Sequence, residues 1–209
     1  MPATKTDPAI DRRRQILRAA MVCFAKCGFH EASMQNISDE AGISVGLIYR
    51  YFASKEAVIS AITEEHKSDI AELLERARLA PTLRDSLEII FTAHCCEDAP
   101  QIHSAFVVDL FAEAGRNPAI ADLVRGVVET MRSGVIDLIA ADPEWQRGAQ
   151  SLSPGEMAEL LFAVARGMMM RDVIEDSASA PAARRDRQLA VVRNLWRLLF
   201  QHANEPALA

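Results

Sequence analysis

Apolar residues along this chain recur with the spacing of helices and almost never with the alternation of strands. Between Ile16 and Cys27 they fall at positions i, i+4, i+7, i+8 and i+11, which is one face of a helix. Gly28 follows and predicts the end of that helix. Two short helices are expected next, at residues 33–41 and 44–52, with Ser33 and Ser44 as N-terminal caps.

A longer helix is then expected from Ser54 to about residue 78, where Pro81 interrupts the chain. Proline-containing turns separate five further expected helices, at residues 83–96, 101–114, 119–141, 154–175 and 182–202. The predicted fold class is therefore all-α with about nine helices. A three-helix N-terminal head precedes a larger helical C-terminal domain.

The segment from residue 37 to residue 52 carries the most specific pattern. Ile37 and Ala41 give the first short helix an apolar side, and Gly42 permits a tight turn after it. Ile48 and Phe52 anchor the second short helix inward. Two short helices joined by a glycine-containing turn are typical of the helix-turn-helix, in which the second helix enters the major groove of DNA.

The outward face of that second helix carries an aromatic and a basic residue that a core does not need. The hydroxyl of Tyr49 can donate to a phosphate, and the guanidinium of Arg50 can bind guanine O6 and N7 with both arms. Gly46 removes a side chain where a backbone comes close.

Residues 41–56, Ala-Gly-Ile-Ser-Val-Gly-Leu-Ile-Tyr-Arg-Tyr-Phe-Ala-Ser-Lys-Glu, resemble the signature of the TetR/AcrR family of transcriptional regulators. The likeness covers about residues 10–57, under a quarter of the chain. It implies an N-terminal DNA-binding domain at residues 1–55 and a ligand-binding and dimerisation domain at residues 56–209.

The resemblance also implies roles for individual residues in DNA binding. Tyr49 and Lys55 match phosphate contacts, and the positions that face the groove or its backbone are Ser44, Gly46, Arg50 and Tyr51. Ser33 and Met34 match the start of the second helix, although the Met34 thioether cannot donate the hydrogen bond expected there. Val45 replaces a common polar residue and can pack on a thymine methyl. Gln35 is a further candidate for a base or phosphate contact.

The charge distribution supports a nucleic-acid partner for one end of the chain only. The net charge is −6, but residues 1–55 hold eight Lys or Arg against five acidic residues, while the remainder is strongly acidic. Arg12, Arg13 and Arg14 can reach backbone phosphates or simply form a solvated helix start.

The last two predicted helices are the candidates for a homodimer interface. The resemblance implies that they form a four-helix interface, and part of each apolar stripe must also serve the core of one chain. The predicted interface residues are Leu160, Val164, Gly167, Arg171, Leu189, Val192, Leu195, Trp196 and Leu199.

Aromatic residues and methionines in the C-terminal domain suit a cavity for an apolar or amphipathic effector, although such residues are more often plain core. The candidate ligand-binding residues are Phe91, His94, Cys95, Phe106, Leu110, Phe111, Met131, Phe162, Met168 and Met169.

The cysteines leave two alternatives open. Cys23 and Cys27 occupy core positions of the first helix and are expected to be buried, but together with His30 they also permit a metal site. Cys95 and Cys96, beside His94, permit oxidation or metal sensing. We expect no metal ion and no cofactor.

Together these patterns predict a ligand-responsive regulator, a repressor that binds palindromic operator DNA as a homodimer and is released by a small effector. A corepressor-dependent regulator and a ligand-free architectural DNA-binding protein are the alternatives. No catalytic or phosphate-loop spacing is present, so an enzyme is not expected. Residues 1–11 lack the apolar core of a secretory signal, and a cytoplasmic location is expected.

Overall fold

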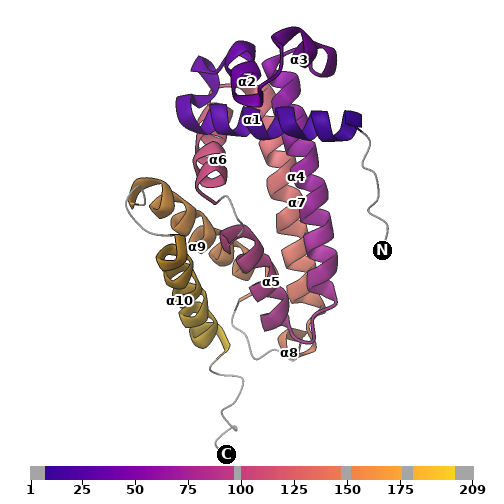
Figure 1. Ribbon diagram of the computed structural model, residues 1–209. Helices are drawn as coiled ribbons and strands as arrows, with labels where there is room; N and C mark the ends of the chain where they lie inside the picture. The colour runs from indigo at the N-terminus through magenta and orange to yellow at the C-terminus, as the bar shows by residue number, and fades with distance from the viewer. Residues whose placement is uncertain (1–7, 97–99, 147–151, 176–180, 201–209) are drawn as a thin grey trace, which may run out of the picture. The chain divides into compact units, whose positions relative to one another are not determined.

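The computed structural model describes residues 8–96, 100–146, 152–175 and 181–200, and within these ranges all regular structure is helical. The helices (Figure 1) are α1 (Pro8–Glu31), α2 (Met34–Ala41), α3 (Val45–Tyr51), α4 (Lys55–Arg78), α5 (Leu83–Cys96), α6 (Pro100–Ala114), α7 (Pro118–Ala141), α8 (Pro143–Gln146), α9 (Pro154–Glu175) and α10 (Pro181–Phe200). The all-α prediction is confirmed. Only the four-residue α8 was not expected, because it is too short to show a period.

The chain divides into two compact units. The first comprises residues 1–67 and 102–127, and the second comprises residues 68–101 and 128–209. The predicted boundary at residue 55, between a DNA-binding and a ligand-binding domain, does not coincide with the division into compact units and stays a prediction. None of the helices in the described ranges combines the length and the hydropathy that crossing a bilayer requires.

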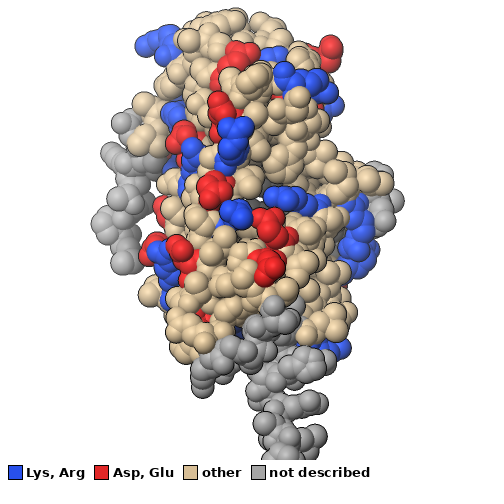
Figure 2. Space-filling view, turned by 180° about the vertical axis from the view of Figure 1, so that it is seen from behind, with Lys and Arg blue, Asp and Glu red and all other residues tan. Residues whose placement is uncertain are grey.

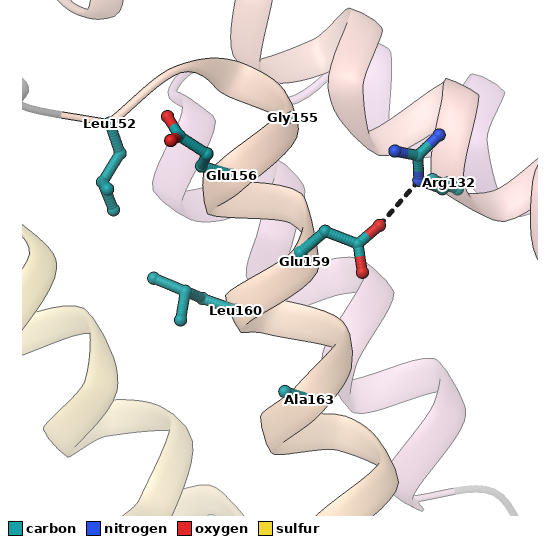
Figure 3. A pocket seen from close by; sticks show the side chains of 7 residues that line it. All are labelled: Arg132, Leu152, Gly155, Glu156, Glu159, Leu160 and Ala163. Atoms are coloured by element: carbon teal, nitrogen blue, oxygen red, sulfur yellow. Dashed lines mark hydrogen bonds and ion pairs between the residues drawn. The ribbon is translucent and has the colours of Figure 1, made fainter.

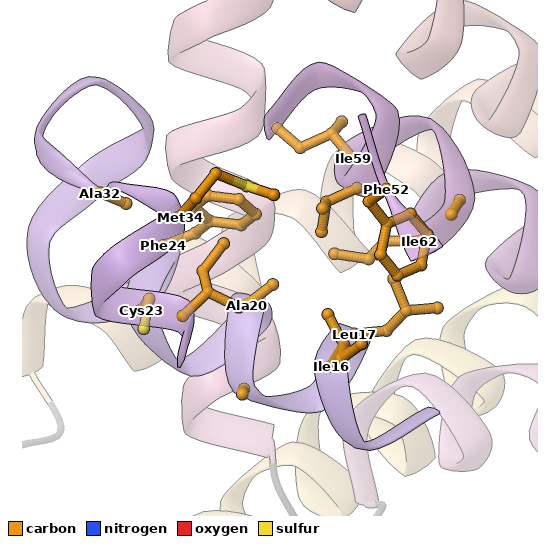
Figure 4. Packing of buried hydrophobic residues seen from close by; sticks show 14 of the residues in the cluster. Ile16, Leu17, Ala20, Cys23, Phe24, Ala32, Met34, Phe52, Ile59 and Ile62 are labelled. Atoms are coloured by element: carbon orange, nitrogen blue, oxygen red, sulfur yellow. The ribbon is translucent and has the colours of Figure 1, made fainter. Parts of the chain in front are cut away.

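The core of the first unit forms around one face of α1. Ile16, Ala20 and Phe24 recur at helical spacing and are almost completely buried, as expected from the sequence. Figure 4 shows their side chains meeting residues of α2 and α4, among them Met34 and Ile59. This cluster fixes α1 against the two short helices.

Gly28 interrupts α1 as predicted, although the chain turns helical again up to Glu31. Its backbone angles of φ 76° and ψ 162° are essentially restricted to glycine. The break lets the last turn of α1 leave the main helix axis, and Ala32 leads directly into the cap of α2.

The turn between α2 and α3 is closed by backbone and side-chain hydrogen bonds. Gly42 adopts the left-handed conformation (φ 66°), and its N–H donates to the carbonyls of Ser38 and Asp39. The buried Ser38 hydroxyl donates to the Ile43 carbonyl across the turn. Ser44 then caps α3 by accepting the N–H of Leu47. The predicted caps and turn are confirmed.

The second unit has its own buried core. Phe91 of α5 meets Trp196 of α10 edge-on, with ring centroids 5.7 Å apart and an interplanar angle of 80°. In the same unit, Gly134 of α7 faces Leu74 of α4 so closely that an added Cβ would overlap the leucine side chain. The missing side chain at residue 134 therefore allows the close approach of α4 and α7 here.

Candidate nucleic-acid interface

The exposed face of α3 is the centre of the candidate interface. Tyr49 is 54% exposed, and Arg50 is also exposed. The opposite side of the helix carries Ile48, which is fully buried, and Phe52 at the end of the helix is buried as well. The core therefore holds α3 in place while leaving its polar face in solvent.

Neither Tyr49 nor Arg50 makes a hydrogen bond or ion pair within the described part of the chain. A phenol and a guanidinium without internal partners, on consecutive residues of one short helix, have their donors available to another molecule. Arginine can read a guanine edge with two parallel N–H donors, and tyrosine can donate to a phosphate.

Gly46 lies on the same exposed side of α3, in the first turn after the Ser44 cap. A Cβ added there would meet no atom of the chain within 4 Å. No internal contact explains a glycine in this helix, where it costs about 0.5–1 kcal/mol of stability relative to alanine. The space in front of Gly46 is open to an external surface.

Two other residues of α3 that were predicted to contact DNA lie at the edge of the core. Val45 and Tyr51 are half-buried and pack against the core cluster of the first unit. Each exposes only part of its side chain, in contrast to Tyr49.

Helix α2 presents two of its predicted residues to solvent. Ser33 is exposed and forms a reciprocal capping box with Asn36, in which each side chain bonds the other's backbone N–H. Gln35 is exposed, and its amide donates to Asp39 Oδ1 at 2.8 Å one turn further along.

Met34 corrects the sequence prediction. Its side chain is 8% exposed and belongs to the core cluster, where Figure 4 shows it beside Phe24. Residue 34 is the first of α2, and its thioether lies in the core rather than on the surface.

Lys55, which the sequence predicts to contact phosphate, is engaged within the chain. Its ammonium donates to the carbonyls of Phe29, His30 (3.1 Å) and Ala32 (2.9 Å). It also lies 4.4 Å from the centroid of the Phe29 ring. An ammonium has three N–H donors, and here all three are used at the end of α1. Lys55 therefore ties α4 to α1 in the free chain, and its contact with phosphate stays a prediction.

The neighbouring Glu56 is held by the start of α4. Its own backbone N–H and the Ser54 hydroxyl lower the pKa of this carboxyl, because both stabilise the charged form. The stability gained from these bonds is present above the ordinary glutamate pKa and is lost as the pH falls through the lowered one.

The arginines at the start of α1 divide into two groups. Arg13 pairs with Glu65 of α4 and lies 5.5 Å from the centroid of the Phe52 ring, so it serves the fold. Arg12 donates to Gln15, and Arg14 is exposed. On the face seen in Figure 2, acidic and basic side chains are interspersed rather than gathered by sign.

The comparisons with known proteins agree with this geometry. The sequence profile of "Bacterial regulatory proteins, tetR family" matches residues 16–62, which run from α1 to α4. The transcriptional regulator UidR of Escherichia coli K12 is 30% identical over 173 residues, which are 79% of this chain and 84% of UidR. The chain belongs to the TetR family of transcriptional regulators.

Solved structures share the fold over most of the chain. Salmonella enterica GusR is 30% identical, with a TM-score of 0.70 over 94% of this chain and 98% of GusR. Bacillus subtilis FadR, solved with stearoyl-CoA, has a TM-score of 0.66 over 86% of this chain and 96% of FadR, at 18% identity. The FadR likeness shows the fold alone.

The residues predicted to line the effector cavity are divided between the two units. Phe106 stacks on Phe24 with ring centroids 6.0 Å apart, and Leu110 belongs to the same core cluster of the first unit. Phe111 is 38% exposed. In the second unit Phe91, Met131 and Met168 are buried, and Phe162 and Met169 are half-buried. The side chains of His94 and Cys95 lie outside the described residues.

An open pocket of about 670 Å³ lies on the surface of α9 in the second unit (Figure 3). Glu159 on this helix pairs with Arg132 Nε of α7 at 2.7 Å. Leu160 and Ala163 add an apolar part to the lining, which is completed by Leu152, Gly155 and Glu156. None of the predicted effector-binding residues lines this pocket.

The predicted dimer-interface residues differ in how exposed their side chains are in the single chain. Leu160 is 50% exposed and Gly167 is exposed, whereas Val164, Arg171, Leu189 and Leu195 are half-buried. Val192 and Trp196 are 3% and 1% exposed, so these two side chains already belong to the core of one chain and offer little surface to a partner. The Leu199 side chain lies outside the described residues.

The cysteine predictions are met in part. Burial raises the pKa of the Cys23 thiol, which keeps it protonated and suited to a core. Cys27 was expected to be buried but is exposed, because it lies one residue before the break at Gly28, and its thiol donates to the Cys23 carbonyl. Within the described ranges no three His, Cys, Asp or Glu side chains gather as metal ligands would.

Two carboxylates of α6 that were not predicted from the sequence lie against the end of α1. Asp109 Oδ2 accepts the Phe29 N–H at 2.7 Å, and Glu113 Oε2 lies 2.8 Å from His30 Nε2. The available signal was a pair of acidic residues four apart in an otherwise apolar segment.

Proposed function

We propose that this regulator is a repressor that binds a palindromic operator as a homodimer in the cytoplasm. The observation that carries the proposal is the exposed face of α3, where Tyr49 and Arg50 have no internal partner and Gly46 leaves open space. Arg50 reads a base, Tyr49 binds a phosphate, and Gly46 lets the duplex backbone approach α3 closely.

A second copy of the chain completes the DNA-binding unit in this proposal. Helix α9 carries an exposed apolar stripe at alternating spacings of three and four residues, which is the spacing of a helix–helix seam. We call this set the α9 stripe; it consists of Leu160, Ala163, Gly167, Met170 and Ile174. Ile174 is 73% exposed in the single chain, and an apolar stripe of this length favours burial against a partner.

Two-fold symmetry explains why the operator should be a palindrome. A symmetric pair of recognition helices matches two half-sites about 34–36 Å apart, or a multiple of that distance. The electrostatic attraction to phosphate alone cannot supply sequence preference, so base contacts such as that of Arg50 are needed for it.

The effector in this proposal is a small apolar or amphipathic molecule that binds the second unit and releases the operator. Buried Phe91, Met131 and Met168 supply adaptable apolar surface. The stearoyl-CoA complex of FadR supports an amphipathic ligand for this fold. A ligand shifts the DNA-binding equilibrium only by its differential affinity for the two states.

Equilibrium titration of a preferred duplex and a scrambled duplex at several salt concentrations tests operator binding. The proposal expects affinities that differ by at least about 10³-fold at physiological salt. Equal affinities with a steep salt dependence would instead identify a ligand-free architectural protein.

Thermal unfolding with a panel of charged, polar and amphipathic compounds tests the effector. A stabilising amphipathic compound that also lowers operator affinity is the expected result. A compound that stabilises the protein and raises operator affinity would identify a corepressor.

A further inference from the structure

The last turn of α1 is hydrogen-bonded on two sides by residues that lie far from it in the sequence. On one side, the Phe29 N–H donates to Asp109 Oδ2 of α6 at 2.7 Å. On the other side, the Phe29 carbonyl accepts the ammonium of Lys55, the first residue of α4. One residue of the chain therefore joins α6 to α4. We call Asp109, Phe29 and Lys55 the α1 clamp.

The break in α1 at Gly28 makes the hydrogen bond between Phe29 and Asp109 possible. With φ 76° and ψ 162°, Gly28 turns the chain so that the next N–H leaves the helical hydrogen-bond pattern and meets Asp109. A Cβ added at Gly28 would lie 3.5 Å from Asp109 Oδ1, so the carboxylate sits directly against the glycine.

A second carboxylate of α6 reinforces the contact one helical turn further on. The Glu113 side chain is 3% exposed, and Oε2 lies 2.8 Å from His30 Nε2 and 3.5 Å from Arg116 Nη2. Asp109 and Glu113 are four residues apart and so face the same way from α6. A buried carboxylate is costly unless it is paired, and the groups nearest to Glu113 Oε2 are the His30 imidazole of the last turn of α1 and the Arg116 guanidinium.

The clamp acts on the segment from which the helix-turn-helix starts. Ala32, whose carbonyl also accepts from Lys55, is followed by Ser33, the N-terminal cap of α2. Lys55 itself follows the end of α3 by only a few residues. Both short helices are therefore anchored to the peptide that Asp109 holds.

We propose that Asp109 and Lys55 are positioning residues for DNA binding, which hold the Phe29 peptide so that α2 and α3 stay in the binding-competent arrangement. This inference rests on the proposed operator binding, because operator affinity is one of its readouts. If the clamp is lost, a smaller fraction of the molecules is in the conformation that binds DNA. The apparent dissociation constant for the operator is the intrinsic constant divided by that fraction, so it rises.

The first test compares three variants of the full chain. Asp109→Ala removes the acceptor of the Phe29 N–H, and Asp109→Asn keeps an acceptor oxygen. Asp122→Asn changes an exposed carboxylate of the same unit, which pairs with the exposed Arg125. We expect operator affinity to fall about tenfold in Asp109→Ala and to stay within about threefold in the other two. Wild-type affinity for Asp109→Ala, or an equal loss in Asp109→Asn, would overturn the proposal.

Amide hydrogen exchange without DNA separates positioning from a general loss of stability. In Asp109→Ala we expect faster exchange at residues 29–41 and unchanged exchange in the second unit. Faster exchange throughout both units would overturn the proposal, and so would an unchanged exchange rate at residues 29–41. Because this measurement needs no operator, it remains informative if the protein binds no palindrome.

The salt dependence of a Lys55→Met variant separates a positioning lysine from a phosphate contact. Loss of a phosphate contact reduces the slope of log affinity against log salt by about 1. We expect weaker operator binding with an unchanged slope and faster exchange at residues 29–32. A slope reduced by about 1 would show that Lys55 binds phosphate and would overturn its place in the clamp.

Discussion

At the scale of single residues, the exposed face of α3 consists of residues that make few contacts with the rest of the described chain. Tyr49 and Arg50 have no internal partner in the described chain, and Gly46 faces open space. Each has a stability cost or no stability benefit in the free protein. Residues of this kind are expected where another molecule supplies the missing contacts.

Replacing Gly46 with alanine should separate stability from function. Alanine in a helix is favoured over glycine by about 0.5–1 kcal/mol, and the added Cβ meets no atom of the chain, so the free energy of unfolding should rise. Operator affinity should fall, because the methyl group meets the duplex. Denaturant unfolding and operator titration measure the two effects. An unchanged affinity would mean that DNA does not approach Gly46.

Replacing Arg50 with alanine should weaken binding to the preferred operator by about 1–3 kcal/mol and relax the base preference at one position of each half-site. Arg125→Ala is the matched control, because Arg125 is an exposed arginine of the same unit that already pairs with Asp122. Titration against operators substituted at each position measures both quantities. If Arg50→Ala keeps the full base preference, Arg50 does not read a base.

At the scale of helices, the sequence predicted most elements because each has a distinct apolar period and a distinct end. Ser33, Gly42 and Ser44 mark the ends of α2 and α3, and the structure confirms all three. Helix α8 was missed because four residues show no period, and α1 begins earlier than its apolar face does.

The candidate site was predicted less completely, because exposure depends on contacts between distant segments. Met34 was expected on the surface and is in the core, since the sequence does not show which way the first residue of α2 points. Lys55 looked available for phosphate, but the carbonyls at the end of α1 bind it. No local pattern foretells such a contact across more than twenty residues.

The close approach of α4 to α7 at Gly134 predicts how a substitution there changes the stability of the protein. Gly134→Ala should lower the free energy of unfolding by about 1–3 kcal/mol, because the new Cβ overlaps the buried Leu74 side chain, which must move. Gly155→Ala is the control, since a Cβ at residue 155 meets no atom within 4 Å. Chemical denaturation of both variants measures the difference. Equal stability would show that the helices accommodate the methyl group without cost.

At the scale of the whole molecule, binding to a palindromic operator requires two copies of the chain. The α9 stripe exposes apolar side chains at helical spacing, while Val192 and Trp196 of α10 are already used inside one chain. The predicted interface therefore depends more on α9 than the sequence alone indicated.

Ile174→Asp should place a charge in the α9 stripe and shift the protein toward monomer. Leu79→Asp is the control, because Leu79 is 87% exposed at the end of α4 and lies outside the stripe. Sedimentation analysis of both variants over a range of concentrations measures the dimer affinity, and operator affinity should fall with it. Wild-type dimerisation of Ile174→Asp would remove the stripe from the interface.

The most direct test of the account is selection of bound duplexes from a random DNA pool by the purified wild-type protein at near-physiological salt. The account predicts enrichment of a palindrome whose half-sites are separated by about one helical turn or a multiple of it. Enrichment of a single, non-repeated half-site would contradict the homodimer. No enrichment, with or without candidate corepressors, would contradict sequence-specific DNA binding itself.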